Sequence, residues 1–280
     1  MTRSRSRTRS RSGSKSFLLD SIKHVFIINL ITRTDRKKQM TQKLKNIGLK
    51  NNKITFVSAT NRSEESWADA LKEIFESNIP INPLDFINET FKKKINSSNV
   101  SINKQARGEI AVFLSHLRIW SMVSRLEHGS YLIFEDDAEP TDMLFNKSTD
   151  ILFKKCLELR VPFIFLGYLF PQCDAGSLKP LKIEGLDNSL ISCFVEALHS
   201  YIIEPSFGLL VRGSLVTDPA FSPLPINDAV DHFVPNFLID YQIPFYIFKR
   251  PLFNQDTTSQ SDIQIVHDDK SANVFKQLGQ

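Results

Sequence analysis

YLIFEDD, residues Tyr131–Asp137, joins four apolar or aromatic residues directly to three consecutive carboxylates. The apolar half predicts a short buried strand, so the three acids follow at its carboxyl end, where open α/β sheets place their ligand crevice. Three crowded negative charges repel one another, and a divalent cation held by oxygen ligands relieves that repulsion. The stretch therefore indicates a metal site that holds a diphosphate.

The same residues also fit a solvated turn. In that interpretation Glu135 and Asp136 face water and Asp137 caps the next helix. Short acidic turns are common, so the surrounding sequence has to separate the two interpretations.

The first 60 residues predict a β-α-β unit. A buried strand is expected at His24–Ile31 (HVFIINLI) and a second at Ile54–Ala59. Between them, Thr34 offers an N-cap to a helix with apolar residues at Met40, Leu44 and Ile47, which ends at Gly48. Such an opening is typical of a parallel sheet with right-handed crossovers.

The rest of the chain continues the alternation of helices and strands. Residues 61–106 are polar and irregular, with a short amphipathic helix at Trp67–Phe75, and are interpreted as an insertion that covers a site or only elaborates the surface. Further elements are expected as helix Gly108–Leu126, strand Tyr131–Phe134, helix Thr141–Leu159, strand Phe163–Tyr168, a hairpin including Leu190–Val195, strand Ser200–Glu204, helix Phe207–Leu215, helix Asp228–Asp240 and strand Pro244–Phe248.

Length and composition favour one large domain. The chain has 280 residues, 41% of them hydrophobic, and can bury a full core without disulfides. The predicted fold class is α/β, a single domain over residues 17–270 with a mostly parallel central sheet and helices on both faces, followed by a tail at 271–280. Three cysteines without paired spacing favour a reducing compartment.

Residues 1–16 form a basic tail of alternating Arg and Ser or Thr. They carry five Arg, Lys15 and no acid, and removing those six charges from the net charge of +4 leaves −2 for the remainder. Such a segment has no apolar surface to bury, so it is expected to be disordered, with weak nucleic-acid or acidic-partner contacts.

No secretory or transmembrane segment is recognisable in the sequence. The apolar cluster Phe17–Leu19 is interrupted at once by Asp20, and the longest apolar stretch, Phe163–Phe170, is too short to span a bilayer. A cytoplasmic location is therefore expected.

Four sequence blocks together carry a family resemblance. In chain order they are Ile27–Leu30 with Arg33, Asp35 and Arg36; Gly108–His116 with Trp120; Ile133–Asp137; and Gln255–Asp256 through Ser261–Ile263. Each block alone is weak, but four in order at plausible spacing are specific. The chain resembles glycosyltransferase family 25, which contains lipooligosaccharide galactosyltransferases and collagen hydroxylysine galactosyltransferases, over residues 24–264.

The resemblance implies a chemistry. It implies a GT-A fold, a UDP-sugar as the nucleotide-sugar donor, galactose as the sugar, and inverting transfer to an acceptor hydroxyl or amine, here a hydroxyl of a glycan or protein, with Mn²⁺ or another divalent cation. Asp137 is then the first candidate for a direct metal ligand and Asp136 the second, while Glu135 is expected to meet the ribose or a metal-bound water.

The donor is expected to meet two further groups of residues. Asn29, Arg33 and Arg36 follow the first strand, where an Arg can bind phosphate oxygens or stack on a base; a capped helix start at the surface is the alternative. Ser115 and His116 lie beside the apolar face of a helix, so His116 is either near the donor or a hydrogen-bonded core residue.

An inverting displacement needs a base for the acceptor proton. Asp231 is the best match, with Asp228 and Asp262 as rivals, and any of them could instead cap a helix. A late group, His267–Asp269, suits Mn²⁺ or belongs to a solvated tail.

Two other functional classes remain open. A metal-dependent phosphatase or nucleotidyltransferase also places acids at strand ends, but a phospho-aspartate phosphatase needs Asp-X-Asp-X-Thr after its first strand, where this chain has Asn29 and Thr32. The other is a catalytically degenerate transferase that acts as an interaction protein through a nucleic-acid-binding Arg/Ser tail.

Overall fold

A seven-stranded mixed sheet is the centre of the protein, in the strand order β2-β1-β3-β7-β5-β8-β6. The computed structural model describes residues 16–78, 80–172, 189–191, 194–216, 226 and 228–256. The strands of this sheet are β1 (His24–Asn29), β2 (Ile54–Ser58), β3 (Tyr131–Glu135), β5 (Phe163–Gln172), β6 (Leu190–Ile191), β7 (Phe194–Ile203) and β8 (Phe245–Phe248). A separate antiparallel pair contains β4 (Ala138–Pro140) and β9 (Phe253–Gln255).

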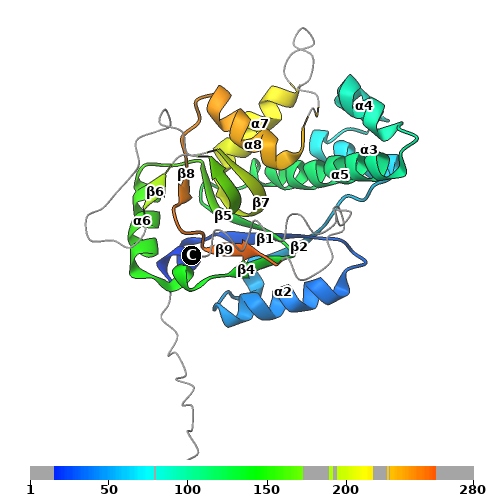
Figure 1. Cartoon of the computed structure of the whole chain (residues 1–280). Coiled ribbons are helices and arrows are strands. Elements are labelled where there is room, and N and C mark those ends of the chain that lie inside the picture. Colours follow the sequence, from blue (N-terminus) through cyan, green and yellow to red (C-terminus); the bar gives the residue numbers. More distant parts are fainter. Residues whose placement is uncertain are drawn as a thin grey trace, which may run out of the picture.

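Helices cover both faces of the sheet (Figure 1). The helices are α1 (Phe17–Ser21), α2 (Thr34–Asn46), α3 (Glu64–Phe75), α4 (Glu89–Ile95), α5 (Val100–Val123), α6 (Lys147–Glu158), α7 (Pro205–Val216) and α8 (Val230–Asp240), with short 3-10 turns η1 (Asn51–Lys53), η2 (Pro83–Phe86) and η3 (Asp142–Phe145). One apolar cluster joins the sheet to α3, α4, α5, α7 and α8, and a second joins its other face to α1, α2 and α6. The predicted α/β fold class is confirmed.

The order in which the chain adds strands to the sheet reverses at β1. The strand β1 pairs in parallel with β2 on one side and with β3 on the other, so the chain moves outward to β2 and then returns past β1 to form β3. Open α/β sheets bind ligands at such a switch point, outside the carboxyl ends of the strands. The β7 strand then runs antiparallel to both β3 and β5 and makes the sheet mixed.

Most predicted elements are present, with shifted ends. The second strand, the helix after Thr34 and the last strand lie where the sequence places them. Thr34 is the first helical residue rather than the cap, because Arg33 occupies the N-cap position. The helix expected over Thr141–Leu159 is instead η3 followed by α6, since the Asn146 side chain accepts a hydrogen bond from the Ser148 amide and starts a new helix there.

The region interpreted as an irregular insertion is largely helical. It contains α3, α4 and the first turns of α5, and it buries Trp67, Leu71 and Phe91 in the core. The helix α5 begins at Val100 rather than Gly108, because Asn99 caps it by accepting hydrogen bonds from the amides of Ser101 and Ile102. The polar residues of its first two turns conceal this start in the sequence.

The described part of the chain sets limits on the terminal predictions. Ser16, the last residue of the predicted disordered tail, is buried and donates a hydrogen bond to Asp150, so the prediction of disorder is wrong for this residue. The Arg/Ser segment 1–15, Cys173, Cys193, Asp262 and His267–Asp269 lie outside the described residues. Of the helices that are described, none combines the length and the apolar character needed to cross a membrane.

Candidate functional site

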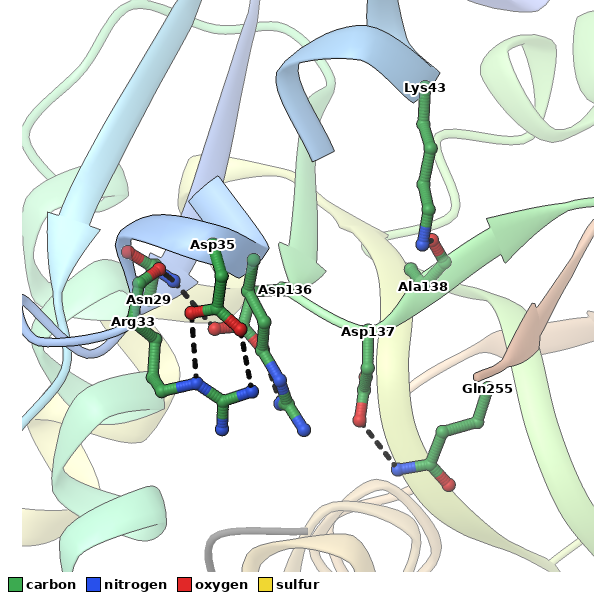
Figure 2. A network of polar contacts seen from close by, with 9 residues as sticks. Asn29, Arg33, Asp35, Lys43, Asp136, Asp137, Ala138 and Gln255 are labelled. Carbon is green, nitrogen blue, oxygen red and sulfur yellow. Dashed lines mark hydrogen bonds and ion pairs between the residues drawn. The ribbon is translucent and has the colours of Figure 1, made fainter. Parts of the chain in front are cut away.

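The site lies at the switch point between β1 and β3. Asn29 is the last residue of β1, and Asp136 directly follows β3. The two side chains meet there, with Asn29 Nδ2 donating to Asp136 Oδ2 at 2.6 Å (Figure 2). The parallel pairing of β1 with β3, which aligns Ile28 with Glu135, brings together these residues that are 107 positions apart.

Arg36 binds the other oxygen of Asp136. Its guanidinium donates to Asp136 Oδ1 at 2.7 Å, and the two side chains are only 8% and 10% exposed. Both oxygens of Asp136 therefore accept hydrogen bonds inside the protein. The interpretation of the acidic stretch as a solvated turn is wrong for Asp136, which is buried, and for Asp137, which leads into β4 and caps no helix.

The carboxylate of Asp137 accepts fewer hydrogen bonds than that of Asp136. Its Oδ2 accepts a hydrogen bond from Gln255 Nε2 at 3.2 Å (Figure 2), and its backbone carbonyl accepts one from the Asp256 amide at 2.8 Å. Its Oδ1 is buried and has no hydrogen-bond partner. Burial, and then the neighbouring Glu135 charge, raises the pKa of Asp137 to about 7.

Glu135 contacts the helical layer that contains α5, on the other face of the sheet from α2. His116 Nε2, on α5, lies 3.1 Å from Glu135 Oε1. Burial raises the pKa of Glu135 to about 7, and the charges of Asp136 and Asp231 add to the effect. His116 itself is fully buried, and burial lowers its pKa to about 3, so it is a neutral imidazole at physiological pH.

Asp231 lies in the first turn of α8 and near the acidic stretch. Its charge raises the pKa of both Glu135 and His116, so the structure brings it to the same site although it is almost 100 residues away in sequence. Its rival Asp228 accepts hydrogen bonds from the Ala229 amide and from His232 Nδ1.

Two of the predicted donor-binding residues are occupied by local contacts. Arg33 makes a two-pronged interaction with Asp35, both contacts at 3.1 Å, at the same edge of the sheet (Figure 2). Ser115 Oγ accepts a hydrogen bond from the Thr60 amide and donates to the Ala111 carbonyl. Ser115 thus ties α5 to the chain after β2 and does not reach the carboxylates through these contacts.

The residues present fit a divalent cation that a substrate helps to hold. Within the described ranges, no three His, Cys, Asp or Glu side chains form a closed metal-binding group. One or two carboxylates are enough where substrate phosphates and water complete the coordination shell, as is usual for Mg²⁺. The unpartnered Oδ1 makes Asp137 the better ligand, because Arg36 and Asn29 already bind both oxygens of Asp136.

Three partners of the site were not predicted as functional residues. Tyr201 and Trp120 form hydrogen bonds behind His116, and Gln255 holds Asp137. Trp120 and Gln255 occur in the blocks that carry the family resemblance, but no local pattern marks Tyr201. Only the pairing of β7 with β3, which aligns Tyr201 with Ile133, brings it near the site.

Asp137→Asn should stabilise the metal-free protein at alkaline pH. Because its folded-state pKa is raised, the native protein holds a proton that the unfolded chain releases between about pH 4 and 7, so this group's contribution to stability falls as pH rises through that range. Asparagine removes the penalty. We expect a gain of about 1 kcal/mol at pH 8, or about 2–4 °C in Tm, which vanishes near pH 4 in thermal melts with chelator.

Glu139→Gln is the matched control, because Glu139 lies two residues further on, is 41% exposed and pairs with Lys43 at 2.5 Å. It should give no gain at pH 8. If Asp137→Asn is less stable than the wild type at every pH, the carboxylate is a structural group and the penalty does not exist.

Comparison with known families agrees with this geometry. Residues 22–167 match the model of glycosyltransferase family 25, which is described as an LPS biosynthesis protein. No curated protein matches the chain. The matched segment is more than half of the 280 residues and contains the site from Asn29 to Asp137, but not Asp231. The chain therefore belongs to glycosyltransferase family 25 and is a glycosyltransferase.

Proposed function

We propose that this glycosyltransferase moves a hexose, galactose in the first instance, from a UDP-sugar to a hydroxyl of a glycan or protein acceptor, with inversion and with Mn²⁺, on a GT-A type of fold. The observation that carries the proposal is the unsatisfied acidic group at the switch point. Glu135 and Asp137 both have a pKa raised to about 7, and Asp137 Oδ1 is buried without a partner. A bound cation would compensate these charges.

The donor is proposed to lie across the carboxyl ends of β1 and β3. Nucleotides bind at this position in open α/β sheets. Asn29 and Arg36 would shape the floor of the site by fixing Asp136, and Arg33, at the start of α2, would face the phosphates or the base. Glu135 would meet a hydroxyl group of the donor.

The chemistry depends on charge. Breaking the bond between the sugar and the diphosphate leaves negative charge on the leaving group, which must be stabilised in the transition state. A divalent cation held by Asp137, with Asp136 close by, would supply that stabilisation. Carboxylates and water are ligands that suit both Mg²⁺ and Mn²⁺.

Asp231 is proposed as the general base. The base must lie across the sugar from the leaving diphosphate, and Asp231 is on α8, on the opposite face of the sheet from α2 and β4. Its electrostatic effect on Glu135 supports a position beside the site. Asp228 is the weaker candidate because His232 and the Ala229 amide already bind it.

Binding of the donor should require the metal. Calorimetry with UDP-galactose should give clear binding in Mn²⁺ and at least a tenfold weaker affinity with chelator, because the diphosphate would then meet uncompensated carboxylates. Equal affinity with and without Mn²⁺ would refute the role of the metal.

Asp137→Asn should reduce metal-dependent hydrolysis of the UDP-sugar by about 100-fold or more, while the rate of Glu139→Gln should stay near that of the wild type.

Asp231→Asn should separate the acceptor step from donor binding. A general base raises the rate of transfer by about 10²–10⁴-fold and contributes little to the affinity for the donor. We therefore expect loss of transfer with an unchanged dissociation constant for the UDP-sugar. Asp228→Asn serves as the control and should retain most activity. Normal transfer by Asp231→Asn would move the base assignment elsewhere.

A further inference from the structure

A chain of hydrogen bonds runs from the protein core to Glu135. Trp120 Nε1 lies 2.9 Å from the Tyr201 hydroxyl, Tyr201 lies 2.7 Å from His116 Nδ1, and His116 Nε2 lies 3.1 Å from Glu135 Oε1. The first three residues are fully buried. They come from α5 and β7, and Glu135 ends β3, so the chain crosses from one layer of the fold to the site.

The direction of these hydrogen bonds follows from the chemistry of their groups. An indole N–H can only donate, so the Tyr201 oxygen accepts from Trp120. The Tyr201 proton then has His116 Nδ1 as its acceptor. A neutral imidazole that accepts at Nδ1 carries its proton on Nε2 and donates from there to Glu135.

The opposite direction leaves a proton without an acceptor. If His116 donated from Nδ1, Tyr201 would accept two hydrogen bonds and its own proton would point into the core. An unsatisfied buried donor costs about 1–3 kcal/mol. The bare Nε2 would also face an oxygen of Glu135, which can supply a proton only when Glu135 is in its neutral form. The Tyr201 proton without an acceptor therefore disfavours this arrangement in either protonation state of Glu135.

Tyr201 is held firmly enough to impose the direction. Its ring stacks on Phe163 with centroids 5.1 Å apart and an interplanar angle of 9°. Tyr201 also pairs with Ile133 across β3 and β7, which fixes its backbone. The hydroxyl group therefore has little freedom to find another acceptor.

We infer that Tyr201 and Trp120 are positioning residues that hold His116 as the Nε2–H tautomer, so that His116 fixes one oxygen of Glu135 from behind and directs the other toward a hydroxyl of the bound substrate. The Glu135 side chain is 25% exposed whereas His116 is fully buried, so only Glu135 reaches the site. This inference rests on the proposed function for the substrate hydroxyl, but not for the tautomer.

Nitrogen-15 NMR of the histidine side chains tests the tautomer directly. His116 can be assigned by comparison with His116→Gln, and the wild-type protein should show the pattern of a neutral Nε2–H ring. Tyr201→Phe removes the hydroxyl that donates to Nδ1, so the Nδ1 resonance of His116 should move to that of a ring nitrogen without a hydrogen bond, while Nε2 keeps its proton and Glu135 as its acceptor. A wild-type ring in the Nδ1–H form would overturn the inference without any need for a variant.

Kinetics test the positioning of Glu135. Tyr201→Phe should lower kcat for UDP-sugar turnover by about 10- to 100-fold, as expected for a misaligned group, with less than about a threefold change in KM. Tyr168→Phe is the matched control, because Tyr168 is also buried and its hydroxyl donates to the carbonyls of Phe248 and Lys249. It should lose stability similarly and keep both kcat and the His116 tautomer.

The possible results separate the inference from the proposed function. Equal kcat values for the two variants would refute the positioning role, as would an unchanged His116 Nδ1 resonance in Tyr201→Phe. A wild-type protein that turns over no UDP-sugar would refute the proposed function. The tautomer spectra would still decide whether Tyr201 and Trp120 orient His116.

Discussion

The buried ion pair between Arg36 and Asp136 is the interaction on which the site depends. It joins the first turn of α2 to the end of β3, and the hydrogen bond from Asn29 adds a second attachment, from β1. Removing one partner of a buried ion pair leaves an uncompensated charge that typically costs about 3–5 kcal/mol. The pair therefore fixes the carboxyl ends of two neighbouring strands at the switch point of the sheet.

Arg36 pairs with Asp136, and the charge of Asp136 adds to the cost of ionising its two neighbours, Glu135 and Asp137. Arg36 balances one carboxylate of the acidic stretch, while Glu135 and Asp137 remain costly to ionise and their pKa values rise to about 7. The orphaned Oδ1 of Asp137 adds the cost of an unsatisfied buried acceptor. This stored electrostatic cost is what a cation with a diphosphate is proposed to relieve, so stability and function oppose each other here.

The sequence predicts the architecture and the acidic site because both leave local signals. Buried strands appear as apolar runs, and the three acids adjoin one of them, at Tyr131–Asp137. The role of Asp136 was not predictable, because its hydrogen bonds with Arg36 and Asn29 depend on the pairing of strands about 100 residues apart in the chain. The same reason hides Tyr201, whose hydroxyl matters only through its alignment with β3. The short strands β4 and β9, which carry Gln255 to Asp137, are too brief to show periodicity.

Anomalous scattering from Mn²⁺ in crystals grown with UDP tests the central claim most directly. The account predicts one strong peak at the manganese edge, within coordination distance of Asp137 Oδ1 and of diphosphate oxygens, with the Arg36–Asp136 ion pair intact. A peak bound elsewhere, or UDP bound at the ends of β1 and β3 without any metal peak, would contradict it. Either result would mean that Glu135 and Asp137, whose pKa values are raised, do not hold a cation at this site.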